Sequence, residues 1–191
     1  MKKIAIALMT LVLWMGLSVT ESGAQQPAQQ HMTFQNVPMD RTIVQFRINL
    51  MARGFKWWED DSRKDPEKDI FTGEVEGVPA YVYAFYSAKN KAVYLTRVYL
   101  VVENEAQMKT KWGQVSDKMI STYRNTGLGA VNENPGKVLT HVDVWRSKNP
   151  AYADGPSELG TIDVYTYVEN SNQTRYYVII DYVDYLNNAN K

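Results

Sequence analysis

The chain has 191 residues, of which 45% are hydrophobic and 22% charged, and its 21 basic residues balance its 21 acidic ones. This hydrophobic fraction indicates a globular protein with a core, and the absence of net charge gives no electrostatic basis for binding nucleic acid or an anionic membrane. The chain has no cysteine, which excludes thiol nucleophiles, disulfides and thiolate metal sites.

Residues 1–24 have the pattern of a secretory signal peptide. Lys2 and Lys3 precede an apolar run that ends near Leu17, and small residues stand at positions 22–24. The apolar run is short for a membrane span, so we expect cleavage before Gln25 and no span in the mature protein. We therefore expect a periplasmic or secreted protein, with an uncleaved N-terminal anchor as the alternative.

Residues 25–32 are polar and rich in glutamine, which predicts a disordered tether in front of a single domain over residues 33–191. The first predicted element of that domain is a helix. Asp40 is its expected N-cap and Gly54 follows its last turn, where a left-handed backbone is common. Its apolar stripe consists of Ile43, Phe46 and Leu50.

Four strands are predicted next, the first of them starting in the aromatic residues 55–58. Short turns separate the others and favour antiparallel pairing; these strands span residues 70–76, 80–88 and 92–102. The charged run 59–69 predicts a solvated loop. A calcium loop built from Asp60, Asp61 and Asp65 is the alternative, although the basic residues of the run oppose a cation.

A second helix is predicted over residues 104–126, because apolar residues recur at helical spacing and Gly127 follows. Three further strands are expected at residues 138–147, 159–169 and 174–186. The order helix, four strands, helix, three strands indicates an α+β fold, an antiparallel sheet of about seven strands with both helices on one face. The halves, 33–103 and 104–191, share this order of elements as two sub-repeats.

The stretch from Phe34 to Asp40, followed by Phe46, Leu50 and Gly54-Phe55, resembles the opening of a group of mostly uncharacterised secreted proteins of gut Bacteroidetes. Their opening reads F-x-G-I-P-I-D, then F-x-x-x-L in a helix, then G-F. Asn36 stands here where glycine is usual. The resemblance covers about the first third of the mature chain. It implies an exported bacterial α+β protein, similar in layout to the β-lactamase-inhibitor-protein fold, and it implies no active site.

Motifs typical of enzymes are missing from the sequence. It contains no G-x-S-x-G, H-E-x-x-H, P-loop or G-x-G-x-x-G motif. A Ser-His-Asp triad would depend on His141, and no strained serine turn offers a nucleophile. We therefore expect a protein that is not an enzyme and that uses no metal or cofactor.

Three aspartates, Asp143, Asp163 and Asp181, lie in the last three predicted strands. Each has a pleat parity opposite to that of its apolar neighbours, so all three are expected on the sheet face away from the core. That face is expected to carry His141, Trp145, Tyr165, Tyr167 and Tyr177 as well. Carboxylates beside aromatic rings are typical of sugar binding or glycoside hydrolysis. The simpler interpretation is a set of solvent-facing aspartates among basic residues.

Tyr81 and Tyr83 share one parity on an earlier strand, and tyrosine and tryptophan dominate the binding energy of protein interfaces. Cross-strand packing is the alternative explanation for such aromatics. We expect an exported, non-catalytic binding module that recognises a protein through an aromatic sheet face. The alternative is a carbohydrate-active or carbohydrate-binding protein that uses the aspartate face. The candidate ligand-binding residues are Tyr81, Tyr83, Trp145, Tyr165, Tyr177, Asp143, Asp163 and Asp181.

Overall fold

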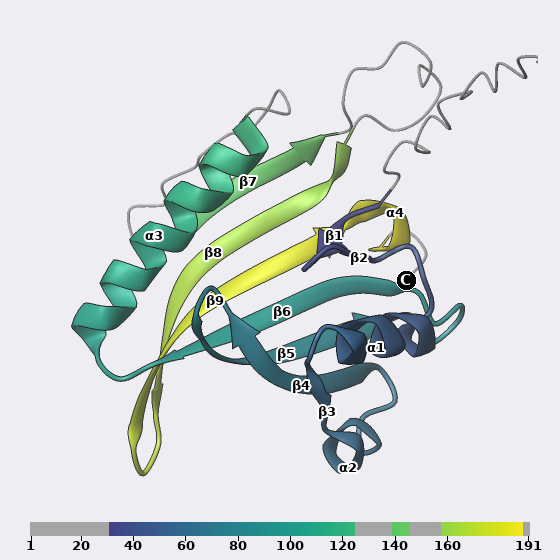
Figure 1. Cartoon of the computed structure of the whole chain (residues 1–191), viewed down its shortest axis with the longest axis horizontal. Helices are drawn as coiled ribbons and strands as arrows, with labels where there is room; N and C mark the ends of the chain where they lie inside the picture. The colour runs from purple at the N-terminus through teal and green to yellow at the C-terminus, as the bar shows by residue number, and fades with distance from the viewer. Residues whose placement is uncertain (1–30, 125–138, 146–157, 189–191) are drawn as a thin grey trace, which may run out of the picture.

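A computed structural model of the chain describes residues 31–124, 139–145 and 158–188. Seven strands form one antiparallel sheet in the order β3-β4-β5-β6-β9-β8-β7 (Figure 1). Their bounds in this order are Lys56–Trp57, Lys68–Val75, Val78–Tyr86, Val93–Val102, Thr174–Asp184, Glu158–Asn170 and Leu139–Trp145. The predicted α+β class and the antiparallel sheet of about seven strands are confirmed.

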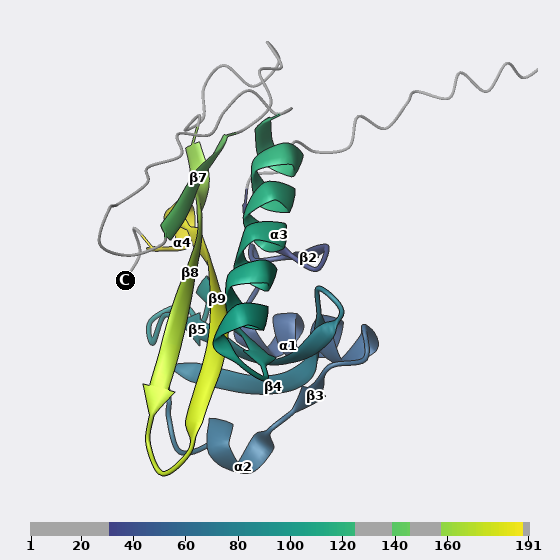
Figure 2. The same ribbon diagram turned by 90° about the vertical axis from the view of Figure 1, so that its left-hand side faces the viewer.

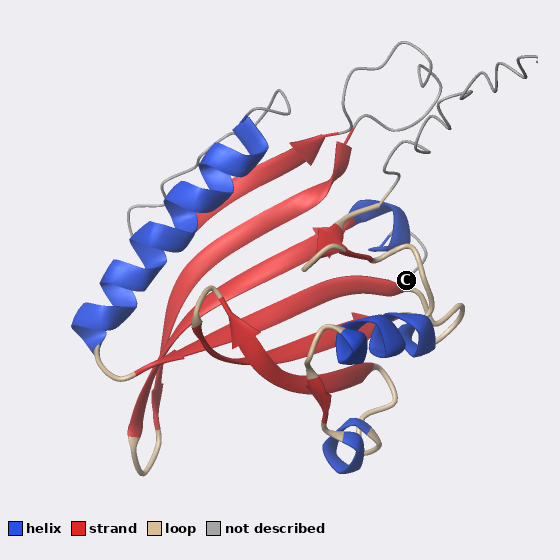
Figure 3. Ribbon diagram, viewed as in Figure 1, coloured by secondary structure: helices blue, strands red, loops and turns tan. Residues whose placement is uncertain are grey.

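Two helices, α1 (Ile43–Ala52) and α3 (Glu105–Arg124), lie on the same side of the sheet (Figures 1 and 2). Two short helices were not predicted: α2 (Glu59–Ser62) and α4 (Tyr185–Asn188), which are shown with the other helices in Figure 3. Both are single turns, too short for a helical repeat of apolar residues to appear in the sequence. None of the helices in the described ranges is long and apolar enough to cross a membrane.

One hydrophobic core fills the space between the sheet and the two long helices. Strand residues such as Val82, Val98 and Ile180 alternate toward the helices and are fully buried. Phe46 and Leu50 of α1 meet them there, and Met108, Val115 and Met119 of α3 extend the same core. Full burial of a side chain such as Leu50 stabilises the fold by about 2 kcal/mol. The core therefore lies on one face of the sheet, and neither long helix covers the other face.

A small hairpin precedes α1 and was not predicted. Its strands are β1 (Thr33–Phe34) and β2 (Val37–Pro38), joined across Gln35 and Asn36. Both turn residues have positive φ, 50° and 56°, as a two-residue hairpin turn of the I′ type requires. Asparagine tolerates this backbone better than most residues, which explains how Asn36 can occupy the turn without being glycine.

Helix α1 begins later than predicted. Its N-cap is Thr42 rather than Asp40, and no side chain caps it. The chain stays extended as far as Thr42 because this residue forms a β-bridge with Ala92, and the Ile43 N–H donates to the Lys91 carbonyl at 2.8 Å. That bond satisfies one of the N–H groups at the start of the helix, which have no acceptor within the helix itself. At the other end Gly54 adopts φ 88°, as predicted.

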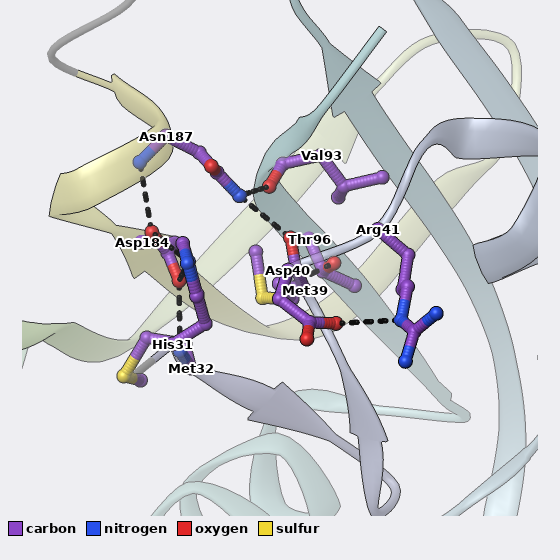
Figure 4. A network of polar contacts seen from close by, with 9 residues as sticks. All are labelled: His31, Met32, Met39, Asp40, Arg41, Val93, Thr96, Asp184 and Asn187. Carbon is purple, nitrogen blue, oxygen red and sulfur yellow. Dashed lines mark hydrogen bonds and ion pairs between the residues drawn. The ribbon is translucent and has the colours of Figure 1, made fainter. Parts of the chain in front are cut away.

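The predicted tether spans residues 25–32, but its last two residues, His31 and Met32, belong to the folded domain. Met32 is 1% exposed, and its N–H donates to Asp184 Oδ2 at 2.7 Å. His31 Nδ1 lies 3.1 Å from the same carboxylate oxygen (Figure 4). The polar composition of the segment hid this contact, because the partner lies more than 150 residues away. Residues 25–30 and the predicted signal peptide, 1–24, lie outside the described residues.

Asp184 also ends β9 two residues before the predicted end of that strand. Its Oδ1 accepts the N–H of Asn187 at 2.9 Å and so caps α4. Asn187 in turn donates to two carbonyls, Met39 O at 2.6 Å and Val93 O at 2.8 Å (Figure 4). The C-terminal segment is thereby fastened to the start of β6 and to the chain after β2.

The charged run 59–69, predicted to be a loop, is more ordered than expected. Helix α2 occupies its beginning and β4 starts within it, at Lys68. The Ser62 hydroxyl organises this turn, since it donates to the Trp58 carbonyl at 2.6 Å and accepts the Ile70 N–H at 2.8 Å. Two of the predicted calcium ligands are paired with lysines, Asp61 with Lys64 at 2.5 Å and Asp65 with Lys68 at 2.8 Å.

Candidate ligand-binding groove

The sheet face turned away from α1 and α3, here called the open face, carries a row of tyrosines. Tyr81 of β5 is paired with Tyr99 of β6, and Tyr167 of β8 is paired with Tyr177 of β9. Their neighbours in sequence, such as Val82, alternate to the core side, so the tyrosines point the other way. Figure 2 shows both long helices on one side of β8 and β9, which is the core side.

Eight side chains of the open face line a groove of about 430 Å³, here called the aromatic groove. This volume lies in the range of small-ligand sites, roughly 300–1,000 Å³. The lining residues are Trp58, Tyr81, Tyr83, Tyr99, Tyr167, Glu169, Arg175 and Tyr177. They come from three segments that are distant in sequence, namely the residue before α2, the β5–β6 pair and the β8–β9 pair.

The rings of the groove hold one another in place. Tyr99 makes edge-to-face contacts on two sides, with Tyr83 at 5.2 Å and with Tyr177 at 5.7 Å between ring centroids. Each such pair adds about 0.5–1.5 kcal/mol beyond simple burial. Tyr177 is only 7% exposed, whereas Tyr167 at 47% and Trp58 at 43% stand open to solvent. The groove therefore has a fixed aromatic floor and an accessible aromatic rim.

Phenol hydroxyls and one ion pair supply the polar groups of the groove. The Tyr177 hydroxyl donates to Glu169 Oε2 at 3.3 Å, and Arg175 Nη1 lies 3.9 Å from the same oxygen. Burial, together with the negative charges nearby, raises the pKa of Tyr83 above its ordinary value, and burial is likewise the main reason that the pKa of Tyr177 is raised. Both phenols therefore stay neutral, and the hydrogen of Tyr177 is already donated to Glu169.

Asp181 is buried on the open face, outside the lining of the groove. Arg97 binds it through two parallel hydrogen bonds, each 2.7 Å long, and the Tyr165 hydroxyl adds a third at 3.1 Å. Burial and the adjacent Asp181 charge raise the pKa of Tyr165, so its hydroxyl remains a donor. Asp181 is thus not a solvent-facing residue, as the simpler interpretation of the sequence had it, but the satisfied partner of an arginine.

Asp143 and Asp163 flank His141 near the edge of the sheet. The His141 ring contacts both carboxylates, with Nε2 at 3.0 Å from Asp143 Oδ1 and Nδ1 hydrogen-bonded to Asp163. Partial burial lowers the pKa of His141, but the hydrogen bond and charge of Asp163 and the charge of Asp143 outweigh it, so the pKa is raised overall. This arrangement stabilises a protonated imidazole between two acids.

The candidate residues whose side chains the structure describes fall into separate groups on the open face. Three of them line the aromatic groove: Tyr81, Tyr83 and Tyr177. The strand register brings the three aspartates to one face, as their parity predicts, with Asp163 directly opposite Asp181. Arg97 satisfies Asp181, and His141 contacts the other two aspartates. The side chain of Trp145 lies outside the described residues.

Five lining residues were not among the candidates: Trp58, Tyr99, Tyr167, Glu169 and Arg175. The parity of Tyr99 was a usable signal, because it alternates with Val98 and Leu100 in a strand that the sequence predicts well. Trp58 had no such signal. Its position depends on β3 ending at Trp57 and on the single turn of α2 that follows.

No protein-family model, curated protein or solved structure matches this chain. Within the ranges that the structure describes, no three His, Asp or Glu side chains are placed to hold a metal ion.

Proposed function

We propose that this protein is an exported, non-catalytic binding module that recognises a protein partner through the aromatic groove. The observation that carries the proposal is the gathering of six aromatic rings around one groove, on the sheet face that neither α1 nor α3 covers. Tyrosine and tryptophan supply large contact areas with few rotatable bonds, and they dominate the hot spots of protein interfaces.

Packing within the folded chain does not fully explain why aromatic residues occupy the rim of the groove, because the rim rings remain exposed. Trp58 and Tyr167 have large apolar surfaces that the folded chain leaves in water, and Trp58 touches Tyr81 only edge to face at 5.6 Å. Exposed aromatics contribute little to stability in this state, but they gain from burial against a partner. A fixed floor and an exposed rim suit a site that closes when a partner covers it.

The carbohydrate alternative at the aspartate face has less support. A glycosidase-like pair requires two carboxyl groups with different protonation roles in one cleft. Here Asp181 is bound to Arg97, while Asp143 and Asp163 share His141, and none of the three lines the aromatic groove. The geometry therefore favours the groove as the binding site.

Two further parts of the proposal concern origin and location. We propose that residues 1–24 direct export to the periplasm or out of the cell, on the basis of their basic start and apolar run. We also propose that the chain belongs with the secreted Bacteroidetes group that its opening resembles. A sheet with helices on one face and a bare second face supports the likeness to the β-lactamase-inhibitor-protein layout.

The test uses mature protein, from residue 25 onward, as bait against periplasmic and secreted fractions of its source. A bound protein is identified, and its Kd is measured for wild type and for the double variant Trp58→Ala, Tyr167→Ala. Loss of two exposed hot-spot side chains is expected to weaken binding by about 2 kcal/mol or more, at least tenfold. Both changes are at exposed positions, so the fold should persist.

The matched control is Tyr185→Ala, which removes an exposed tyrosine of α4 that does not line the groove. This variant should bind like wild type. Equal affinity of the folded double variant and wild type would contradict the proposal, as would the absence of any partner that binds wild type.

A further inference from the structure

We infer that the aromatic groove takes up a basic side chain, an arginine or lysine that the protein partner presents. The inference rests on the proposed function and names the chemistry of the group that enters the groove. Its grounds are the ring faces that line the groove, the carboxylate of Glu169 among them, and the long ion pair, 3.9 Å, between that carboxylate and Arg175.

Ring faces attract cations because the π-electrons give each face a negative potential. A guanidinium or ammonium group within about 6 Å of a tyrosine or tryptophan centroid is attracted to the ring, most strongly when water is excluded. Six such rings line this groove. At the rim, Trp58 lies edge to face with Tyr81, and Tyr167 stacks on Tyr177 at 6.2 Å between ring centroids. Both rim rings still expose surface that an inserted side chain can contact. An alkyl stem of lysine or arginine would also find apolar contact between the rings.

Glu169 supplies the negative charge that selects a cation over a neutral group. Its carboxylate accepts a hydrogen bond from Tyr177, which orients one oxygen, and its ion pair with Arg175 is 3.9 Å long. That is the longest ion pair among the described residues. By contrast, Arg97 binds Asp181 at 2.7 Å with both donors. Glu169 is therefore the carboxylate of the open face that keeps capacity for a new cation.

Arg175 marks the place that the partner's cation would take. It is paired with Glu169 across the β8–β9 hairpin and lines the same groove. Its side chain is 58% exposed, and an exposed pair of this kind is weak because water screens both charges. Arg175 also forms a hydrogen bond with the Tyr177 side chain, so an entering cation has to replace that contact as well as the pair with Glu169. We therefore expect Arg175 to compete with the ligand rather than to help bind it.

The test uses small probes, so it does not depend on knowing the partner. N-acetyl-arginine methylamide is titrated into the mature protein, beside the citrulline analogue, which has nearly the same shape without the charge, and beside a neutral disaccharide. Binding is followed by NMR at the Trp58 indole N–H, assigned by its loss in Trp58→Phe. The arginine probe is expected to shift this signal with an affinity about tenfold higher than that of citrulline.

Two charge variants test the role of the ion pair. Glu169→Gln should weaken arginine binding about tenfold, and Arg175→Gln should strengthen it several-fold because the competing cation is gone. The control Glu105→Gln removes an exposed acid from α3, on the other side of the sheet, and should change nothing. High salt should weaken the arginine probe more than the citrulline probe.

Several results would overturn the inference: no shift with the arginine probe up to its solubility, equal binding of citrulline or of the disaccharide, or no effect of Glu169→Gln. Failure here is separable from failure of the proposed function. If Trp58→Ala, Tyr167→Ala still abolishes binding of the partner, the groove remains the site and only the basic side chain is wrong. If that variant leaves the partner bound, both proposals are wrong.

Discussion

At the scale of single residues, Asp184 has the largest structural role that the sequence did not reveal. It is completely buried, and its two oxygens accept the N–H groups of Met32 and Asn187. If a buried acceptor is removed, the N–H groups that it bound are left without a partner. The cost of such an unsatisfied buried donor exceeds the net stabilisation that a hydrogen bond provides. The contacts of Asp184 join the two ends of the described chain, so damage here should affect the whole domain.

We predict that Asp184→Asn lowers the free energy of unfolding by about 2–4 kcal/mol, because one amide N–H₂ must face a backbone donor. Urea denaturation followed by circular dichroism measures the change. Asp40→Asn is the control, since Asp40 is exposed and pairs with Arg41 only at 3.4 Å. Its change should stay within about 0.5 kcal/mol. If Asp184→Asn lowered the free energy of unfolding by no more than about 0.5 kcal/mol, the role assigned to this carboxylate would be wrong.

His141 is the second residue with a consequence of its own, because its stabilising contacts require the charged ring. Its folded pKa lies above the ordinary value of 6.5. The contribution is therefore fully present below pH 6.5 and is lost as the pH rises through the raised pKa. Since the side chain is more than a quarter exposed, the effect is limited to about 1 kcal/mol.

The expected result is a difference in unfolding free energy between wild type and His141→Gln that is largest below pH 6.5 and shrinks toward alkaline pH. The comparison with His141→Gln isolates the contribution of this ring from that of other groups that change charge with pH. Equilibrium unfolding across the range measures it. A difference that grows with pH would show that the ring is stabilised in its neutral form instead.

At the scale of elements, the β8–β9 hairpin depends on one glycine. A Cβ at Gly160 would lie 1.8 Å from the Val183 carbonyl oxygen, which is backbone and has no freedom to turn away. The two strands lie so close here that only glycine fits. Gly160→Ala should therefore destabilise the domain by about 3 kcal/mol or more, or prevent folding.

A glycine-to-alanine substitution in α3 should instead raise the free energy of unfolding. Nothing lies within 4 Å of a Cβ at Gly113, which is in the middle of the helix. Gly113→Ala is therefore expected to raise the free energy of unfolding by about 0.5–1 kcal/mol through the better helix propensity of alanine. Thermal unfolding of both variants side by side makes the comparison. A stable Gly160→Ala would show that β8 and β9 pair with a different spacing.

Element boundaries show where local patterns suffice. Helix α3 starts after Asn104, whose side-chain oxygen accepts the Gln107 N–H at 2.9 Å, in keeping with the polar start that the sequence indicates. Helix α1 departs from the pattern because Thr42 and Ile43 are bound to residues near Ala92. A boundary is predictable when its hydrogen bonds are local, and it moves when a distant strand supplies them.

At the scale of the whole molecule, β6 and β9 pair with each other, although they belong to the two predicted halves of the chain. This pairing brings Tyr99 against Tyr177 and so connects the two parts of the aromatic groove. The partner-binding test at Trp58 and Tyr167 belongs to this scale. Both side chains are at the rim, so their loss should alter the binding surface while the core under α1 and α3 keeps its packing.

The sequence by itself determined the α+β class, the seven-stranded antiparallel sheet, the two amphipathic helices and the parity that sends the tyrosines and aspartates to one face. These features follow from local periodicity, which repeats every two residues in a strand and every 3.6 in a helix. Only the tertiary structure decided which of those side chains meet. Strand order and register place Trp58 and Glu169 in one groove. They also put Arg97 of β6 beside Asp181 and His141 of β7 beside Asp163. Such contacts arise from pairings between distant segments, and no local pattern encodes them.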